Sequence, residues 1–392
     1  MAIKAYRHLF LAFLTIGSVS FGGYMALISM IREKLVKRDQ LLDDNRMSEA
    51  IALASFLPGP VAVNVVAFAG YTIAGIAGAV ISIVAVLIPS FLAVLALSIL
   101  YFEYESKLDF DSIMVGITPV IIGIIFSVAV TMARKNCKTV VEAAIAVVGL
   151  IVLFFLPGYW PVILVLVAAG LFGIFYYNQD PDPQDGTGVA GKTKYAWVVL
   201  PVIAILLVVR YAFPENINVK LFGEFSAVSL TLFGGGYVMV PVLQSLLVEQ
   251  LQWLSKDEFI FGISIGQVTP GPILISAAFF GYKMNGIIGS VIATLGIFIP
   301  SSILMIAASR FYMQLKDNRG MKAALAGIRP AVTGLIFYSG FSLFFGQVKN
   351  NNIWFSLPLI VLAFLSIFRF NVSPVIVVIA GGVLGFLVNG ML

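Results

Sequence analysis

Short polar stretches divide the chain into thirteen apolar runs, most of them long enough to cross a lipid bilayer. In lipid, runs of this length are expected to form helices, because a helix satisfies its own backbone hydrogen bonds. The runs cover residues 8–30, 47–71, 73–101, 112–133, 139–156, 159–177, 195–212, 221–248, 258–281, 286–309, 325–345, 353–368 and 371–391. The pattern predicts an all-α polytopic membrane protein.

The composition excludes a soluble fold. Hydrophobic residues make up 60% of the chain and charged residues 11%, which leaves too little polar surface to face water. The net charge of +5 does not indicate nucleic-acid binding, because the basic residues lie in short loops between runs, where they set topology. The expected surroundings are therefore a lipid bilayer, with no nucleic-acid partner.

Cofactor chemistry and enzymatic activity are not expected. The single Cys137 and single His8 offer no cluster for a transition metal, so we predict no metal and no cofactor. Residues 186–193 match a phosphate-binding loop pattern, but a polar linker precedes them where a strand is required. We therefore infer no ATPase and no other enzyme.

Five short motifs recur in order. Phe21-Gly22-Gly23 returns as Phe233-Gly234-Gly235, and Pro58-Gly59-Pro60 returns as Pro270-Gly271-Pro272, both 212 residues later (233 − 21 and 270 − 58). The other recurring motifs, at a separation of 211, are Gly70-Tyr71 with Gly281-Tyr282, Ile88-Pro89-Ser90 with Ile299-Pro300-Ser301, and Gly116-Ile117 with Gly327-Ile328. Their shared order indicates an internal duplication.

The number of runs between equivalent motifs decides how the halves are related. Seven runs separate the start of one repeat from the start of the next, and an odd number of crossings places the second repeat upside down. We predict an amino-terminal repeat over 1–177, a polar linker with one connecting helix (195–212) over 178–220, and an inverted repeat over 221–392. Inverted repeats are typical of secondary transporters and channels, with the binding site near the midplane.

The first two runs of each repeat are interrupted near their middle by the FGG or PGP motif. If these runs are re-entrant hairpins, nine runs cross fully and most Lys and Arg residues lie on the amino-terminal side; thirteen full crossings give a much weaker bias. We prefer the re-entrant arrangement. Either count places the amino terminus in the cytoplasm and the carboxyl terminus outside, in a cell membrane.

The PGP motifs predict helix breaks that can bind an anion. Two prolines remove backbone donors and the glycine between them can adopt a positive φ, so the helix must stop and restart. A half-helix that starts after the motif points its free N–H groups and positive dipole end at the break. The alternative is a kink that serves packing only. The predicted binding residues here are Pro58, Gly59, Pro60, Pro270, Gly271 and Pro272.

Further candidates flank the breaks. Asn64 and Ser276, which are equivalent at a separation of 212, lie one turn beyond the PGP motifs, and Gln267 and Thr269 lie just before the second. Hydrogen bonding between helices is the structural alternative for each. The glycines of the FGG motifs allow close approach of a ligand or of another helix; they are Gly22, Gly23, Gly234, Gly235 and Gly236.

Arg329 is the only basic residue placed inside an apolar run, so it is a candidate for neutralising an anion. Because Arg329 lies about one turn into its run, its side chain can instead extend to the membrane interface.

These motifs resemble the chromate ion transporter family in its long, two-half form. The resemblance rests on FGG, L-P-G-P-x-A, F-G-G-G-Y-V-x-x-P-V-L over 233–243 and Q-V-T-P-G-P over 267–272, and spans nearly the whole chain. It implies a bacterial or archaeal inner-membrane protein that moves chromate outward. Tyr24 and Val61 stand where many members have Pro and an acidic residue, so another oxyanion such as sulfate stays a second candidate.

The expected function is therefore secondary transport of an inorganic oxyanion, most simply chromate efflux by alternating access. An anion channel and a protein that handles phosphorylated lipids are the alternatives. The sequence leaves open the coupling ion and whether two copies associate as a homodimer.

The topology can be tested with single cysteines at Lys37 and Asp109 in a Cys137→Ser background. We expect an impermeant thiol reagent to label only position 109 in intact cells, because the re-entrant arrangement puts residues 32–46 in the cytoplasm. Labelling of position 37 from outside would contradict that arrangement and favour thirteen crossings.

Overall fold

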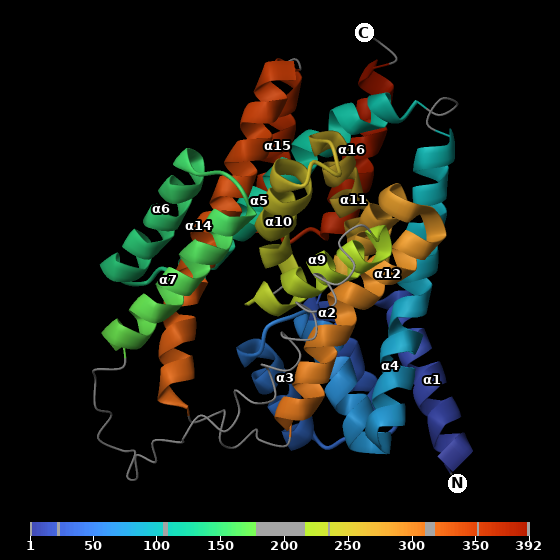
Figure 1. Cartoon of the computed structure of the whole chain (residues 1–392). Coiled ribbons are helices and arrows are strands. Elements are labelled where there is room, and N and C mark those ends of the chain that lie inside the picture. Colours follow the sequence, from blue (N-terminus) through green and yellow to red (C-terminus); the bar gives the residue numbers. More distant parts are fainter. Residues whose placement is uncertain are drawn as a thin grey trace.

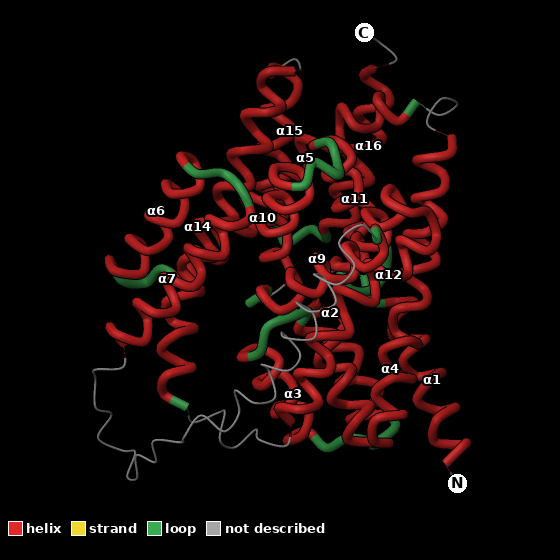
Figure 2. The backbone as a smooth tube through the Cα atoms, viewed as in Figure 1, coloured by secondary structure: helices red, strands yellow, loops and turns green. Residues whose placement is uncertain are grey.

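The computed structural model describes residues 2–21, 24–104, 109–177, 216–233, 236–309, 318–350 and 353–389, and these ranges contain helices and loops but no strand (Figure 2). The all-α prediction is confirmed for this part of the chain. Five of its helices are apolar and long enough to cross a membrane by themselves: α4, α5, α7, α12 together with η4, and α14. The protein is thus a multi-pass membrane protein.

The first half contains α1 (Ala2–Val19), α2 (Tyr24–Ile31), the π-helix η1 (Arg32–Arg38), α3 (Asp44–Phe56), α4 (Val61–Tyr104), α5 (Phe110–Asn136), α6 (Val140–Phe155) and α7 (Tyr159–Tyr177). The second half contains α9 (Ile217–Thr231), η2 (Gly236–Val238), α10 (Met239–Leu243), the π-helix η3 (Gln244–Gln250), α11 (Lys256–Val268), η4 (Ile273–Ile275), α12 (Ser276–Ser309), α14 (Arg319–Asn350), α15 (Ile353–Phe368) and α16 (Pro374–Asn389). The linker and connecting helix expected within 178–212 lie outside the described residues, so the domain boundaries stay predictions.

The local geometry repeats at the separation found in the sequence. The bounds of α11 are those of α3 shifted by 212 residues, and the bounds of η3 are those of η1 shifted by the same number (256 − 44 and 244 − 32). Gln40 and Gln252, again 212 apart, both have positive φ angles, of 50° and 53°. Two sequences that share few residues therefore fold into the same succession of elements.

Both α4 and α12 are helical hairpins. The backbone leaves the helical region at Ala74 and Gly75 in α4, and at Asn285 and Gly286 in α12. A Cβ built on Gly70 would lie 2.5 Å from the carbonyl oxygen of Gly78, which is impossible for residues eight apart in one straight helix. The chain therefore folds back at each of these points.

Short arms result from these breaks and turns. The helix α3 has 13 residues, and the first arm of α4 runs only from Val61 to the turn at Ala74. Thirteen helical residues span about 20 Å, less than the roughly 30 Å of a bilayer core. Such arms fit the predicted re-entrant hairpins, although the number of full crossings stays a prediction.

The two halves exchange their carboxyl-terminal hairpins. The pair α6 and α7 of the first half packs against α14 of the second, whereas α15 and α16 of the second half pack against α5 of the first (Figure 1). The hairpin helices α4 and α12 also pack against each other, with α1 beside α4 and α9 beside α12. The break at each PGP motif lies directly before one of these hairpin helices.

Candidate anion site at the paired helix breaks

The PGP motifs break the chain as the sequence predicts. The helix α3 ends at Phe56 and α4 begins at Val61; in the second half α11 ends at Val268 and η4 begins at Ile273. Gly59 has a φ of +112° and Gly271 a φ of +105°, a region that side chains disfavour. The flanking prolines bring no N–H groups, so each motif leaves the glycine as the only donor of its three residues.

Each PGP glycine donates its hydrogen bond to the opposite half. The amide of Gly59 donates to the carbonyl oxygen of Leu232 at 2.7 Å, and the amide of Gly271 donates to the carbonyl oxygen of Ser20 at 2.8 Å. Leu232 and Ser20 directly precede the two FGG motifs and are themselves 212 residues apart (232 − 20). Each PGP break is therefore joined to the end of the helix that precedes the FGG motif of the opposite half, and these two equivalent contacts are called the junction here.

Two serines complete this junction. A Cβ built on Gly59 would lie 2.2 Å from the Cβ of Ser301, and one built on Gly271 would lie 3.1 Å from the Cβ of Ser90. Both serines are fully buried and again belong to the opposite half from the glycine that they touch. The sequence marked them only as part of a repeated Ile-Pro-Ser motif; that recurrence was the available signal for a role at the site.

Two amide side chains at the junction keep a polar group unpartnered. Asn64 is fully buried and donates from Nδ2 to the Pro58 carbonyl oxygen at 3.3 Å, while its Oδ1 makes no hydrogen bond within the described residues. Gln267 is 6% exposed and accepts from the hydroxyl of Tyr237 at 3.2 Å, while its Nε2 has no described partner. Buried polar groups without partners are uncommon, and of these two atoms only Nε2 of Gln267 can donate to an anion, because Oδ1 of Asn64 is an acceptor.

The hydroxyl groups of two further candidates are already engaged. Thr269 donates to the Ile265 carbonyl oxygen at 2.9 Å, and Ser276 donates to the Ile273 carbonyl oxygen at 2.7 Å. Both residues are buried beside the second PGP motif, so the structure brings them to the site. Because both hydroxyl groups donate to carbonyl oxygens of their own segments, neither is available to an anion. Of the three candidates beside the second PGP motif, Gln267 is the one whose side-chain N–H group has no described partner.

Of the FGG glycines, the structure describes one, and it lies beside the helix start that follows the second PGP motif. Gly22, Gly23, Gly234 and Gly235 lie outside the described residues. Gly236 begins η2, and a Cβ there would meet only ordinary contact with Leu274 at 3.8 Å.

The side chain of Arg329 is exposed on α14. Its carbonyl oxygen accepts from Thr333 at 3.1 Å and, weakly, from Asn136. No described contact joins Arg329 to the breaks.

Comparison with known proteins decides the family. The family model described as chromate transporter matches residues 7–174 and again residues 219–386. The chain belongs to the chromate transporter family. Each match spans one of the two halves found above, and membership identifies the protein as a membrane transport protein.

Several curated proteins resemble this family member along most of its length. An uncharacterised transporter of Methanocaldococcus jannaschii is 28% identical, over 97% of this chain and 94% of its own. A chromate transport protein of Cupriavidus metallidurans is 28% identical over 84% of this chain and 80% of its own, and one of Pseudomonas aeruginosa is 26% identical over 98% and 92%. No solved structure matches the transporter.

The junction predicts a specific rescue. Gly59→Ala should lower the free energy of unfolding of the purified transporter by about 2–6 kcal/mol, combining overlap with Ser301 and a disfavoured φ. Adding Ser301→Gly removes the overlap and should leave only the backbone cost of about 1–3 kcal/mol. Denaturation by titrated detergent measures the free energy of unfolding of the single and the double variant.

Gly75→Ala is the matched control, because its φ is +66° but nothing lies within 4 Å of the added methyl group. Gly75→Ala should lower the free energy of unfolding only by the cost of the disfavoured backbone angle. A double variant no more stable than Gly59→Ala would disprove the contact between the halves.

Proposed function

We propose that this transporter exports chromate across the cell membrane by alternating access, with the anion held at the junction of the paired helix breaks. The observation that supports this most strongly is the reciprocal pair of hydrogen bonds from Gly59 and Gly271. These bonds tie each helix start to the opposite half of the protein, which a kink that served packing within one helix would not do.

The helix start after the first break suits an anion. The first hydrogen bond within α4 runs from the Asn64 amide to the Pro60 carbonyl oxygen, so the amides of the three preceding residues have no partner inside the helix. These amides and the helix dipole place partial positive charge at the break. The free Nε2 of Gln267 adds a neutral donor from the second half.

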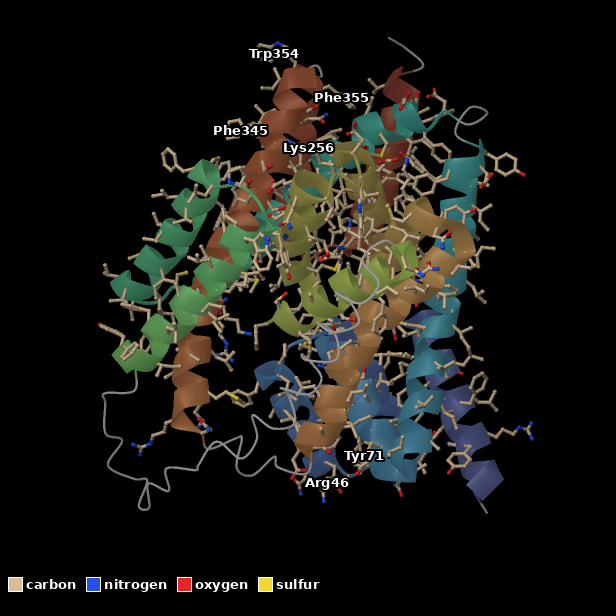
Figure 3. The ribbon with its side chains drawn as sticks, in the orientation of Figure 1. Arg46, Tyr71, Lys256, Phe345, Trp354 and Phe355 are labelled. Atoms are coloured by element: carbon tan, nitrogen blue, oxygen red, sulfur yellow. The ribbon has the colours of Figure 1, made fainter. Side chains whose placement is uncertain are left out.

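The proposed inversion explains access from both membrane faces. Figure 3 shows Arg46, near the start of α3, at the lower end of the molecule, and Lys256, at the start of the equivalent helix α11, toward the upper end. Equivalent arms thus approach the junction from opposite ends. A rocking motion of the arms would open the same site to each side in turn.

The membrane potential can drive export. With the amino terminus in the cytoplasm, moving a dianion out of a cell that is negative inside releases about 2.3 kcal/mol per charge for each 100 mV, hence roughly 4.6 kcal/mol. The bacterial or archaeal inner membrane supplies such a potential. Export of chromate therefore needs no further energy source, although a coupled ion can still set its rate.

Uptake of labelled chromate into inverted membrane vesicles tests this proposal, with labelled sulfate as the competing substrate. We expect saturable chromate uptake that depends on the membrane potential. Preference for sulfate would replace chromate with the second oxyanion, and conduction far above transporter turnover in a bilayer recording would favour a channel. Transport of phosphorylated lipid in place of either anion would overturn the proposal.

Gln267→Glu should weaken chromate binding in these vesicles by more than tenfold, because it replaces a free N–H donor with an oxygen that repels the anion. Tyr237→Phe is the matched control: it removes only the hydrogen bond that positions Gln267, worth about 0.5–1.5 kcal/mol, and should weaken binding roughly two- to twelvefold. Unchanged affinity in Gln267→Glu would remove this residue from the site.

A further inference from the structure

A pocket lies between the end of α6, the start of α11 and one face of α14. It has a volume of about 250 Å³. Its lining residues come from both halves of the protein: Phe154 and Pro157 from the first, and Lys256, Tyr338, Ser342, Phe345 and Gly346 from the second. The pocket therefore adjoins the contact between the α6–α7 hairpin and α14, at the opposite end of α11 from the second PGP motif.

The single charged group that lines the pocket is the amine of Lys256, whose side chain lies against α14. A Cβ built on Gly346 would lie 3.3 Å from Nζ and 3.4 Å from Cδ of Lys256, and its three nearest atoms all belong to this lysine. The glycine thus leaves room for the amine beside the α14 backbone. No described carboxylate forms an ion pair with Lys256, so the lysine brings an uncompensated cation to the pocket.

The charge of Lys256 does not stabilise the helix that this residue begins. The positive end of the helix dipole favours acidic residues in the first turn and disfavours cations. The first turn of α11 follows this rule with Asp257 and Glu258, and Glu258 also completes a capping box with Ser255. Lys256 is the exception, so the stability of α11 does not explain its charge.

The first half shows that the fold does not require this lysine or the glycine beside it. Asp44 stands in place of Lys256 at a separation of 212, and Lys135 stands in place of Gly346 at a separation of 211 (256 − 44 and 346 − 135). Asp44 forms an ion pair with Arg32 at 3.0 Å. The duplicated architecture thus forms with the opposite charge at the start of the arm.

Exposed apolar side chains adjoin the pocket. Phe154 and Phe345, which line it, are 45% and 52% exposed, and Phe155 and Leu156 at the end of α6 are exposed as well. In a membrane protein such side chains face lipid, because apolar surface is costly in water. Figure 3 shows Lys256 and Phe345 in the upper part of the molecule, toward the end that carries the exposed Trp354.

This combination fits the headgroup of a phospholipid better than a free anion. A cation in a pocket between membrane helices attracts an anionic headgroup. The volume is below the roughly 300–1,000 Å³ of sites that enclose a whole drug-sized ligand, so the pocket admits a phosphate with its glycerol while acyl chains stay outside. A free anion would use Lys256 alone, because the Tyr338 hydroxyl already donates to Glu249 at 3.1 Å, and would leave the exposed phenylalanine rings without a contact.

We propose that this pocket binds the headgroup of one anionic phospholipid, with the phosphate on the Lys256 ammonium and the acyl chains against Phe154 and Phe345. The bound lipid joins the α6–α7 hairpin of the first half to the start of α11 in the second. In the predicted orientation the outer leaflet supplies it. The site is separate from the helix breaks and does not depend on which anion the protein transports.

Native mass spectrometry of the full-length transporter tests the site by titration with phosphatidylglycerol, or with phosphatidylcholine that has the same acyl chains. We expect one phosphatidylglycerol to bind more tightly than further copies and than phosphatidylcholine. Lys256→Gln should weaken this binding about fivefold or more, the effect of one lysine on an anionic lipid, and leave phosphatidylcholine within about twofold. Unchanged phosphatidylglycerol binding in Lys256→Gln would overturn the proposal.

Lys220→Gln is the matched control. It removes a lysine of the same half that does not line the pocket and whose Nζ lies 5.5 Å from the centre of the Trp253 ring. We expect both lipid affinities to stay within about twofold of wild type. An equal loss of phosphatidylglycerol binding in both lysine variants would show general attraction to a basic protein and would overturn the specific site.

Gly346→Leu tests the position of the lysine without changing any charge. The added side chain begins 3.3 Å from Nζ of Lys256, so it should displace the amine and weaken phosphatidylglycerol binding about fivefold. Denaturation of the same sample shows whether this variant is folded; if it is not, Lys256→Gln, which changes an exposed side chain, carries the test. Wild-type affinity in folded Gly346→Leu would contradict the proposed place of the phosphate.

Competition separates a lipid from a free anion. Millimolar inorganic phosphate or chromate should leave the bound phosphatidylglycerol in place, because neither anion replaces the contacts of the acyl chains. Displacement by phosphate would show a free-anion site, and displacement by chromate would make the pocket part of the transport path; either result would overturn the lipid proposal. The binding assay contains no transport step, so its outcome and that of the chromate uptake assay are independent.

Discussion

The structure depends on two backbone hydrogen bonds that join its halves. A helix broken inside a membrane must have its freed backbone groups satisfied by protein or by a water-filled cavity, since lipid offers no partner. The amides of Gly59 and Gly271 find theirs in Leu232 and Ser20 of the opposite half. Because each half satisfies the break of the other, neither half can bury its own PGP motif alone. The duplication therefore matters for the structure, because each half supplies a hydrogen-bond acceptor that the other half needs.

The exchange of hairpins extends the same principle to the rest of the fold. The helices α6 and α7 cover the long helix of the second half, and α15 and α16 cover that of the first. The contacts between the halves therefore extend from the junction to the carboxyl-terminal hairpins.

Much of the fold could be predicted from the sequence, because apolar length and repeated short motifs are local signals. Helix breaks at both PGP motifs followed from the chemistry of proline and glycine. The partners across the junction could not be predicted, because the repeat relates Ser20 to Leu232 and Gly59 to Gly271 but does not say which pair touches.

The same physical reasoning separates the candidate residues. Asn64 and Gln267 keep unpartnered polar atoms at the junction, whereas Thr269 and Ser276 donate to their own helices and Arg329 is exposed elsewhere. An intramembrane arginine is a strong signal in a sequence. The arginine side chain, however, is long enough to reach the membrane interface from within an apolar run, so its position in the sequence does not place its charge at the anion site.

Anomalous X-ray scattering from chromium, in crystals of the full-length protein grown with chromate, tests the central claim most directly. The account predicts one chromium peak at the junction, next to the amides that open α4 after Pro60 and those that open η4 after Pro272, within reach of the Gln267 side chain. A peak beside Arg329 on α14, or in the pocket next to Lys256 with none at the breaks, would contradict it.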